Sequence, residues 1–151
     1  MNIPFHMIDS LQLVYQDAYC ETLWIGDIRC LYQRYKQMPK ASHLIPYYYQ
    51  QIEAWLCQKT QPFPILAFII EVPHGQPLPA DDITWPHTTQ LIHLNALNIY
   101  QIVYVSRFNL FNHIVLKKGG HRNLQQDTTI MIFQDASTAF DWVEVTHKLA
   151  Q

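Results

Sequence analysis

The sequence predicts an α/β fold: one domain with a mixed β-sheet, in which an N-terminal antiparallel β element is followed by the order α-β-α-β-α-β-α. Short runs of β-branched and aromatic residues alternate with stretches in which apolar residues recur every three or four positions. Strands that alternate with helices pair in parallel through right-handed crossovers. A length of 151 residues is typical of one domain that buries its own core, so we expect residues 1–151 to form a single unit.

The N-terminal third predicts antiparallel strands. Leu11–Tyr15 partly alternates between apolar and polar residues, as a half-buried strand does. Thr22–Ile25 and Ile28–Tyr35 are rich in β-branched and aromatic residues and flank Gly26. These two segments form either a second hairpin or one strand kinked by a bulge at Gly26. We therefore expect a sheet of five or six strands.

The next two elements are a helix and a buried strand. Ser42 can cap a helix at its start. Apolar residues with helical spacing predict that this helix has one apolar face, formed by Leu44, Ile45, Tyr48, Tyr49, Ile52, Trp55 and Leu56. Ile65–Ile70 is a continuous apolar run between prolines and predicts a central strand buried on both faces. The proline-rich segment 71–82 predicts the longest loop.

The C-terminal half repeats the alternation of helix and strand. Pro86 stands near the start of a predicted helix that runs to Leu97, and the strand Ile99–Val105 follows. Ser106 can cap a helix that carries Phe108, Phe111, Ile114 and Val115. Thr129–Phe133 is the last predicted strand. Asp135 or Ser137 caps the final helix, which buries Ala139, Phe140 and Val143.

Charge and composition exclude several classes of function. A formal net charge of −2 argues against non-specific nucleic-acid binding, which needs a concentrated basic face. No apolar run approaches the length of about 18 residues that a transmembrane helix needs. The N-terminus lacks the basic and apolar regions of a signal peptide. Three cysteines without Cys-x-x-Cys spacing then indicate reduced thiols, so we expect a cytoplasmic protein.

A low charged content also bears on partners. Charged residues make up 15% of the chain and aromatic residues 13%. Such a composition favours apolar or aromatic surface patches, and with them a protein partner or self-association, for example as a homodimer. A large core with ordinary exposed tyrosines explains the same numbers equally well. In Tyr47-Tyr48-Tyr49, at least one side chain points outward while its neighbours face the core.

The last strand and helix carry a family resemblance. The segment Ile132–Val143 reads Ile-Phe-Gln-Asp-Ala-Ser-Thr-Ala-Phe-Asp-Trp-Val. Together with the order of elements, it resembles the STAS superfamily (sulfate transporter and anti-sigma factor antagonist), and within it the SpoIIAA-like branch. The resemblance implies a regulatory, protein-binding domain. Anti-sigma factor antagonists carry a phosphorylatable serine in an Asp-Ser-Ser/Thr-Gly motif after the central strand. That motif is absent here, and Thr88 and Thr89 match its location only.

The candidate site residues follow from this resemblance and from the loops expected at the carboxyl ends of the strands. The predicted regulatory or partner-binding residues are Trp85, His87, Thr88, Thr89 and Ser106. A basic cluster beside two glycines, Lys117, Lys118 and Arg122, is a candidate anion-binding site, and a solvated helix end is the plainer interpretation of it.

No motif for a metal, a cofactor or catalysis is present. His87 and His93 stand six positions apart, and no His-x-x-x-His spacing occurs, so we expect no metal site. No nucleophile elbow or phosphate-binding glycine loop occurs either, and Cys30 and Cys57 are expected to be packing residues. The leading hypothesis is a non-catalytic regulatory or protein-interaction module. The alternatives are a carrier or sensor of a small apolar, lipid-like ligand, and an enzyme with an unrecognised site.

Overall fold

The computed structural model describes residues 3–37, 44–58, 65–73, 94–106, 113–116 and 128–150. Its elements, in chain order, are η1 (Phe5–Ser10), β1 (Leu11–Gln16), β2 (Cys20–Ile25), η2 (Gly26–Ile28), β3 (Cys30–Tyr35), α1 (Leu44–Cys57), β4 (Ala67–Glu71), β5 (Gln101–Val105), β6 (His113–Leu116), β7 (Thr128–Phe133) and α4 (Ala136–Ala150). Among the described residues, no helix is both long and apolar enough to cross a membrane.

All the described strands join one mixed sheet in the order β1-β2-β3-β4-β5-β7-β6. β1, β2 and β3 pair antiparallel, whereas β3, β4, β5 and β7 are parallel to one another. β6 pairs antiparallel with β7 at the far side. This arrangement confirms the α/β class, the mixed sheet and the N-terminal antiparallel element. β4 lies in the middle of the order, as its continuous apolar run predicts.

The turn after β2 is a second hairpin, one of the two forms that the sequence left open. η2 occupies Gly26–Ile28, and Arg29 closes it in the left-handed conformation with φ 49 and ψ 48. Its N–H donates to the carbonyl of Gly26 at 3.3 Å. The irregularity of the sheet lies instead in β1, where the register shifts between Leu13 and Tyr15 and leaves Val14 as the extra residue of a bulge.

α1 covers one face of the sheet. Its inward side chains, Tyr48, Tyr49, Ile52 and Trp55, are buried in a core with residues of the strands such as Phe68 and Ile102. Tyr47 is exposed, as predicted for one of the three consecutive tyrosines. Cys57, expected to pack near the core, is exposed instead. It is the last residue of α1.

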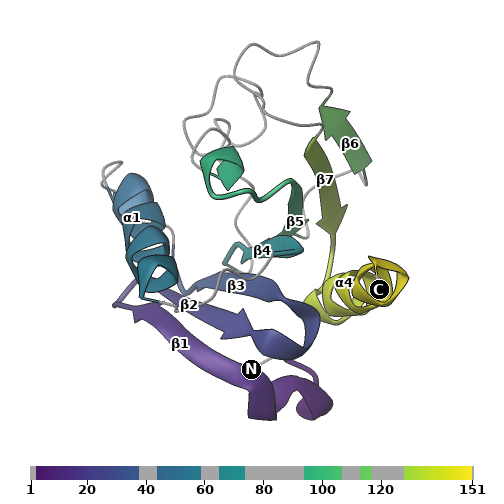
Figure 1. Cartoon of the computed structure of the whole chain (residues 1–151), viewed down its shortest axis with the longest axis horizontal. Helices are drawn as coiled ribbons and strands as arrows, with labels where there is room; N and C mark the ends of the chain where they lie inside the picture. The colour runs from purple at the N-terminus through teal and green to yellow at the C-terminus, as the bar shows by residue number, and fades with distance from the viewer. Residues whose placement is uncertain are drawn as a thin grey trace.

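α4 covers the opposite face, so that α1 and α4 enclose the sheet between them (Figure 1). Asp135 caps α4, because its Oδ1 accepts hydrogen bonds from the N–H and the hydroxyl of Thr138, both at 2.8 Å. The three predicted core residues, Ala139, Phe140 and Val143, are buried. η1 packs on the same face and buries Met7.

The prediction of a helix after Ser106 is wrong at residues 113–116. His113–Leu116 is the edge strand β6, in which Ile114 pairs with Ile130 and Val115 with Thr129. Two adjacent β-branched residues favour a strand, and β7 offers them a complete hydrogen-bonding edge. The described residues therefore form a sheet of seven strands, in place of the expected five or six. Of the helix predicted between Pro86 and Leu97, residues 94–96 are helical and the remainder lies outside the described residues.

Candidate functional site

The ends of several elements meet at one edge of the sheet. The carboxyl ends of β3, β4, β5 and β7 lie there because these strands are parallel. The tip of the β1–β2 hairpin lies at the same edge, since Cys20 pairs with Tyr35 at the end of β3. α4 also begins here, directly after β7. In an α/β sheet this carboxyl edge is where ligands and partners are usually bound.

A carboxylate holds the hairpin tip against α1. Oδ1 of Asp17 accepts the backbone N–H groups of Tyr19 at 2.7 Å and Cys20 at 2.8 Å. Its Oδ2 accepts the hydroxyls of Tyr48 at 2.9 Å and Tyr15 at 3.3 Å. Burial alone would raise the pKa of Asp17, but these hydrogen bonds outweigh burial and hold the pKa below its ordinary value. Asp17 is thus ionised and fully hydrogen-bonded at neutral pH.

Tyrosine rings surround this carboxylate. Tyr15 contacts Tyr47 and Tyr48 with ring centroids 5.7 and 5.6 Å apart, and Tyr35 lies 6.1 Å from Tyr48. Burial and the charge of Asp17 raise the pKa of Tyr15 to about 12, and the same two causes raise the pKa of the Cys20 thiol to about 12. The phenol of Tyr15 and the thiol of Cys20 therefore stay protonated at neutral pH, and neither is an activated nucleophile. The cluster connects the hairpin tip to α1 and so has a structural role.

A second polar group at this edge is the ion pair between Arg34 and Glu71. Nε of Arg34 lies 3.6 Å from Oε2 of Glu71, across the paired strands β3 and β4. The buried Tyr32 lies on the same strand face and packs edge-on against Phe140. Burial, and after it the Glu71 carboxylate, raise the pKa of Tyr32 above its ordinary value. Its hydroxyl has no hydrogen-bond partner among the described residues.

Ser106 is the one predicted site residue that the structure describes. It is buried directly after β5, and its N–H donates to the carbonyl of Phe133 at 2.8 Å. It extends the pairing of β5 with β7, and the helix through Ile114 and Val115 that it was expected to cap is replaced there by β6. The other predicted residues, Trp85, His87, Thr88, Thr89, Lys117, Lys118 and Arg122, lie outside the described residues, as does Ser42.

Neither a metal centre nor an activated buried thiol stands out in the described part of the chain. No three histidine, cysteine, aspartate or glutamate side chains come together there in a way that could hold a metal ion. The three cysteines are unpaired, and burial raises the pKa of Cys30 above its ordinary value. Packing accounts for Cys30, as expected from its place in a strand.

Sequence reasoning missed an exposed apolar surface near the N-terminus. Phe5 is 89% exposed and Leu13 55% exposed, and Ile8 is exposed as well. Phe5 and Ile8 stand three residues apart on a 3₁₀ helix, which places them on the same side of η1. Leu13 lies on β1, at the outer side of the sheet. We call these three residues the N-terminal apolar surface. Hydrophobic periodicity alone does not predict that the side chains of Phe5 and Ile8 are exposed.

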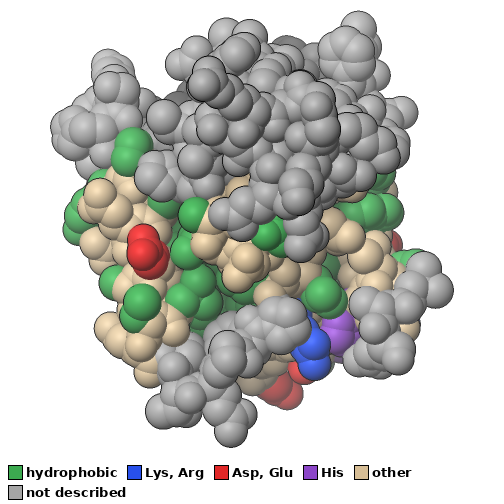
Figure 2. All heavy atoms as spheres, turned by 45° about the horizontal axis from the view of Figure 1, so that its top comes forward, with side chains coloured by type: hydrophobic (Ala, Val, Ile, Leu, Met, Phe, Trp, Pro, Cys, Tyr) green, Lys and Arg blue, Asp and Glu red, His purple; other side chains and the backbone are tan. Residues whose placement is uncertain are grey.

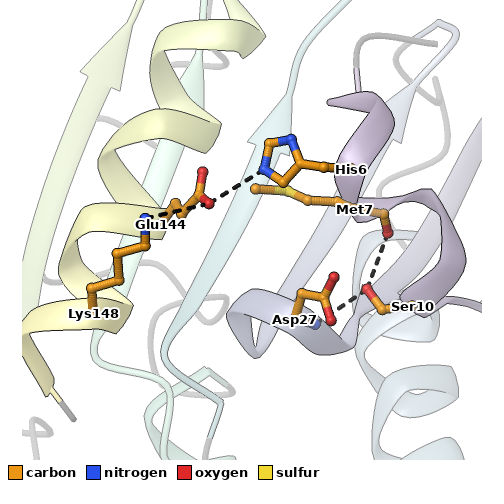
Figure 3. A network of polar contacts seen from close by, with 6 residues as sticks. All are labelled: His6, Met7, Ser10, Asp27, Glu144 and Lys148. Atoms are coloured by element: carbon orange, nitrogen blue, oxygen red, sulfur yellow. Dashed lines mark hydrogen bonds and ion pairs between the residues drawn. The ribbon is translucent and has the colours of Figure 1, made fainter.

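Polar contacts fix η1 in place (Figure 3). The hydroxyl of Ser10 donates to the carbonyl of Met7 at 3.0 Å and accepts the N–H of Asp27 at 3.2 Å. Nε2 of His6 lies 3.3 Å from Oε1 of Glu144 on α4. These contacts connect η1 to the second hairpin and to α4, so the N-terminal apolar surface rests on a well-anchored segment.

Comparisons with protein-family models, with curated proteins and with solved structures return no match to this chain. The function is therefore argued from the residues and their geometry.

Proposed function

We propose that this chain is a non-catalytic regulatory or protein-interaction module that binds its partner through the N-terminal apolar surface. The observation that carries the proposal is the exposure of Phe5 and Ile8 on η1 and of Leu13 on the neighbouring element of the chain, β1. Large apolar side chains that gather at a surface are typical of protein-binding sites, because covering them removes apolar area from water.

The anchoring of η1 supports this proposal. Within η1, the side chain of Met7 is buried, His6 contacts Glu144 on α4, and Ser10 accepts a hydrogen bond from the N–H of Asp27. Phe5 and Ile8 are therefore presented by a short helix that needs no ordering before it binds. Pre-organisation of this kind lowers the entropic cost of association.

One face of the described structure carries few charges, which is compatible with a partner-binding role. On the face shown in Figure 2, the described side chains are mostly hydrophobic or uncharged, and the charged groups are few. Depletion of charge is characteristic of the central part of protein–protein interfaces.

The resemblance to STAS and SpoIIAA-like domains is a finer part of the proposal. The mixed sheet and the strand–helix unit β7–α4 are compatible with it. In this form of the proposal, a phosphate on Thr88 or Thr89 adds negative charge to this segment and so regulates binding. Partner binding that is insensitive to Thr88→Ala, Thr89→Ala and Trp85→Ala would remove the regulatory part and leave the interaction surface.

The packing around α1 favours an interaction module over the apolar-ligand carrier. Tyr49 lies against Phe68 with ring centroids 6.2 Å apart, and Trp24 lies 5.9 Å from Trp55. These ring contacts lie in the described part of the layer between α1 and the sheet. Native mass spectrometry would support the carrier if a small mass left the protein on denaturation.

The experiment that tests the proposed surface is site-specific photo-cross-linking in cells. A photoreactive phenylalanine analogue replaces Phe5 in one variant, Leu13 in a second and Val145 in a third. Val145 is the matched control because it is an apolar residue of α4 with the same exposure as Leu13, 55%. We expect one discrete cross-linked species from positions 5 and 13 and none from position 145. Equal labelling at all three positions, or none, would contradict the proposal.

A further inference from the structure

The two exposed sides of η1 differ in chemistry. A 3₁₀ helix has three residues per turn, so residues three apart share one side. Met7 marks the side that faces the core, because it is buried. Phe5 and Ile8 form an apolar side, and His6 and Asp9, which are also exposed, form a polar side. The apolar side of η1 therefore lies directly beside a carboxylate.

Leu13 lies on the same face of the sheet as η1. It pairs with Leu23, and Leu23 packs in the same core as Met7. Opposite residues of an antiparallel pair point to the same face of a sheet. One partner on this face can therefore contact all three residues of the N-terminal apolar surface.

Carboxylates from three elements stand at the rim of this surface. Asp9 directly follows Ile8 in the chain. Asp27 lies next to Ser10, because its N–H donates to the Ser10 hydroxyl at 3.2 Å. Glu144 contacts the polar side of η1 from α4. Figure 3 shows that Asp27 and Glu144 reach η1 from two other elements, η2 and α4.

The carboxylates outnumber the cations at this rim. Glu144 is paired with Lys148, whose Nζ lies 3.8 Å from Oε1. Asp9 and Asp27 are exposed, and neither is in an ion pair within the described ranges. The first lysine or arginine of the chain is Arg29, directly after η2. Three carboxylates against two cations leave one net negative charge beside the apolar side chains.

We propose that the partner of the N-terminal apolar surface is a protein segment that carries lysine or arginine beside its apolar residues. The inference rests on the proposed function, since it names the class of partner for the same surface. Apolar residues of the segment cover Phe5, Ile8 and Leu13, and its cations lie near Asp9 and Asp27. An apolar centre with a polar rim is the common arrangement of protein interfaces, and charge complementarity at the rim orients the partner.

The same charges favour a protein over a membrane surface. Exposed apolar side chains also insert into lipid bilayers, but there lysine and arginine usually accompany them, because the headgroups they meet are anionic. Asp9 and Asp27 would instead face headgroups of their own sign. A basic protein segment meets both the apolar centre and the acidic rim with complementary groups.

The test uses the full chain with a photoreactive phenylalanine analogue at position 5. After irradiation in cells, the cross-linked peptide of the captured protein is sequenced. We expect a lysine or arginine within about four residues of the cross-linked position, the spacing of side-chain neighbours on a helix. The association rate of the captured protein is then measured at ionic strengths of about 0.1 M and about 1 M. The rate should fall with salt, because the Debye length shortens from about 10 Å to about 3 Å.

Charge reversal distinguishes the rim from the rest of the molecule. Asp9→Lys and Asp27→Lys should each slow association by about threefold or more at low salt, because each turns an attraction into a repulsion. Glu53→Lys is the matched control, since it makes the same change of charge at an exposed position of α1, on the opposite face of the sheet. It should change the rate little. Circular dichroism of each variant shows that the fold is retained.

Association that is independent of salt and of both charge reversals, or a cross-linked peptide without a basic residue, would overturn the inference. The proposed function would then still stand, because the surface would remain an interface. Cosedimentation of the chain with vesicles of phosphatidylcholine and phosphatidylserine, abolished by Phe5→Glu, would overturn the inference in favour of a membrane. If no protein is captured from position 5, both proposals fail.

Discussion

At the scale of single residues, Asp17 shows how one carboxylate can connect two elements. It accepts four hydrogen bonds, two from its own turn and two from tyrosine hydroxyls. One of those hydroxyls belongs to Tyr48 on α1, so the hairpin tip and the helix are held by the same charged group. Charge-assisted hydrogen bonds of this kind are among the stronger ones in proteins.

Replacing Asp17 by alanine should lower the free energy of unfolding by about 2 kcal/mol, because buried donors would lose their acceptor. The folded-state pKa of Asp17 lies below its unfolded value. Its contribution is therefore present at neutral pH and is lost as the pH falls through the folded-state value. Urea unfolding of wild type and Asp17→Ala at neutral pH checks the loss of stability. Urea unfolding of wild type and Asp17→Asn at neutral and acid pH checks the dependence on pH.

The matched control is Asp9→Asn, an exposed carboxylate on η1. Wild type and Asp9→Asn should lose stability on acidification by similar amounts, and Asp17→Asn by less. If Asp17→Asn and wild type respond alike to pH, the carboxylate does not have the role described here.

Residue exposure was the least predictable property. Cys57 fits the apolar side of α1 by spacing, yet it is exposed at the end of the helix. Leu13 fits a half-buried strand by alternation, but its exposure depends on β1 being the outermost strand. Both outcomes depend on where an element ends or lies in the sheet, which periodicity does not contain.

At the scale of elements, the unit β7–α4 was the best predicted. Thr128–Phe133 alternates buried and half-buried residues, and Asp135 then caps α4. Each local preference there agrees with the tertiary structure. The opposite holds at His113–Leu116, where a few apolar residues fit a helix by spacing but form β6, because pairing with β7 was available. Short segments are often decided by their neighbours.

The cap at Asp135 leads to an element-scale prediction. Asp135→Ala removes the acceptor for the N–H of Thr138 and should lower the free energy of unfolding by about 1 kcal/mol. Asp141→Ala, at an exposed position within the same helix, should change it by less than about 0.5 kcal/mol. Thermal or urea denaturation measures both. Equal effects of the two substitutions would show that charge and not capping is responsible.

At the scale of the whole molecule, the sequence predicted the class, the parallel centre and the antiparallel start of the sheet. The mixed order follows from alternation of strands with helices, and the structure confirms it. The location of the exposed apolar residues did not follow from the sequence. The predicted face at the carboxyl edge includes a buried Ser106, whereas the exposed apolar residues lie on η1 and β1. Only the three-dimensional order of the strands shows that β1 is an edge.

The measurement that tests the account most directly is hydrogen–deuterium exchange of the full chain, free and bound to the partner that photo-cross-linking at residues 5 and 13 captures. The account predicts that amides of η1 and β1 exchange more slowly in the complex, because the partner covers these elements, while amides of α4 around Val145 do not change. Phe5→Glu should weaken the complex. Unchanged exchange in η1 and β1 on binding would contradict the proposed interaction surface.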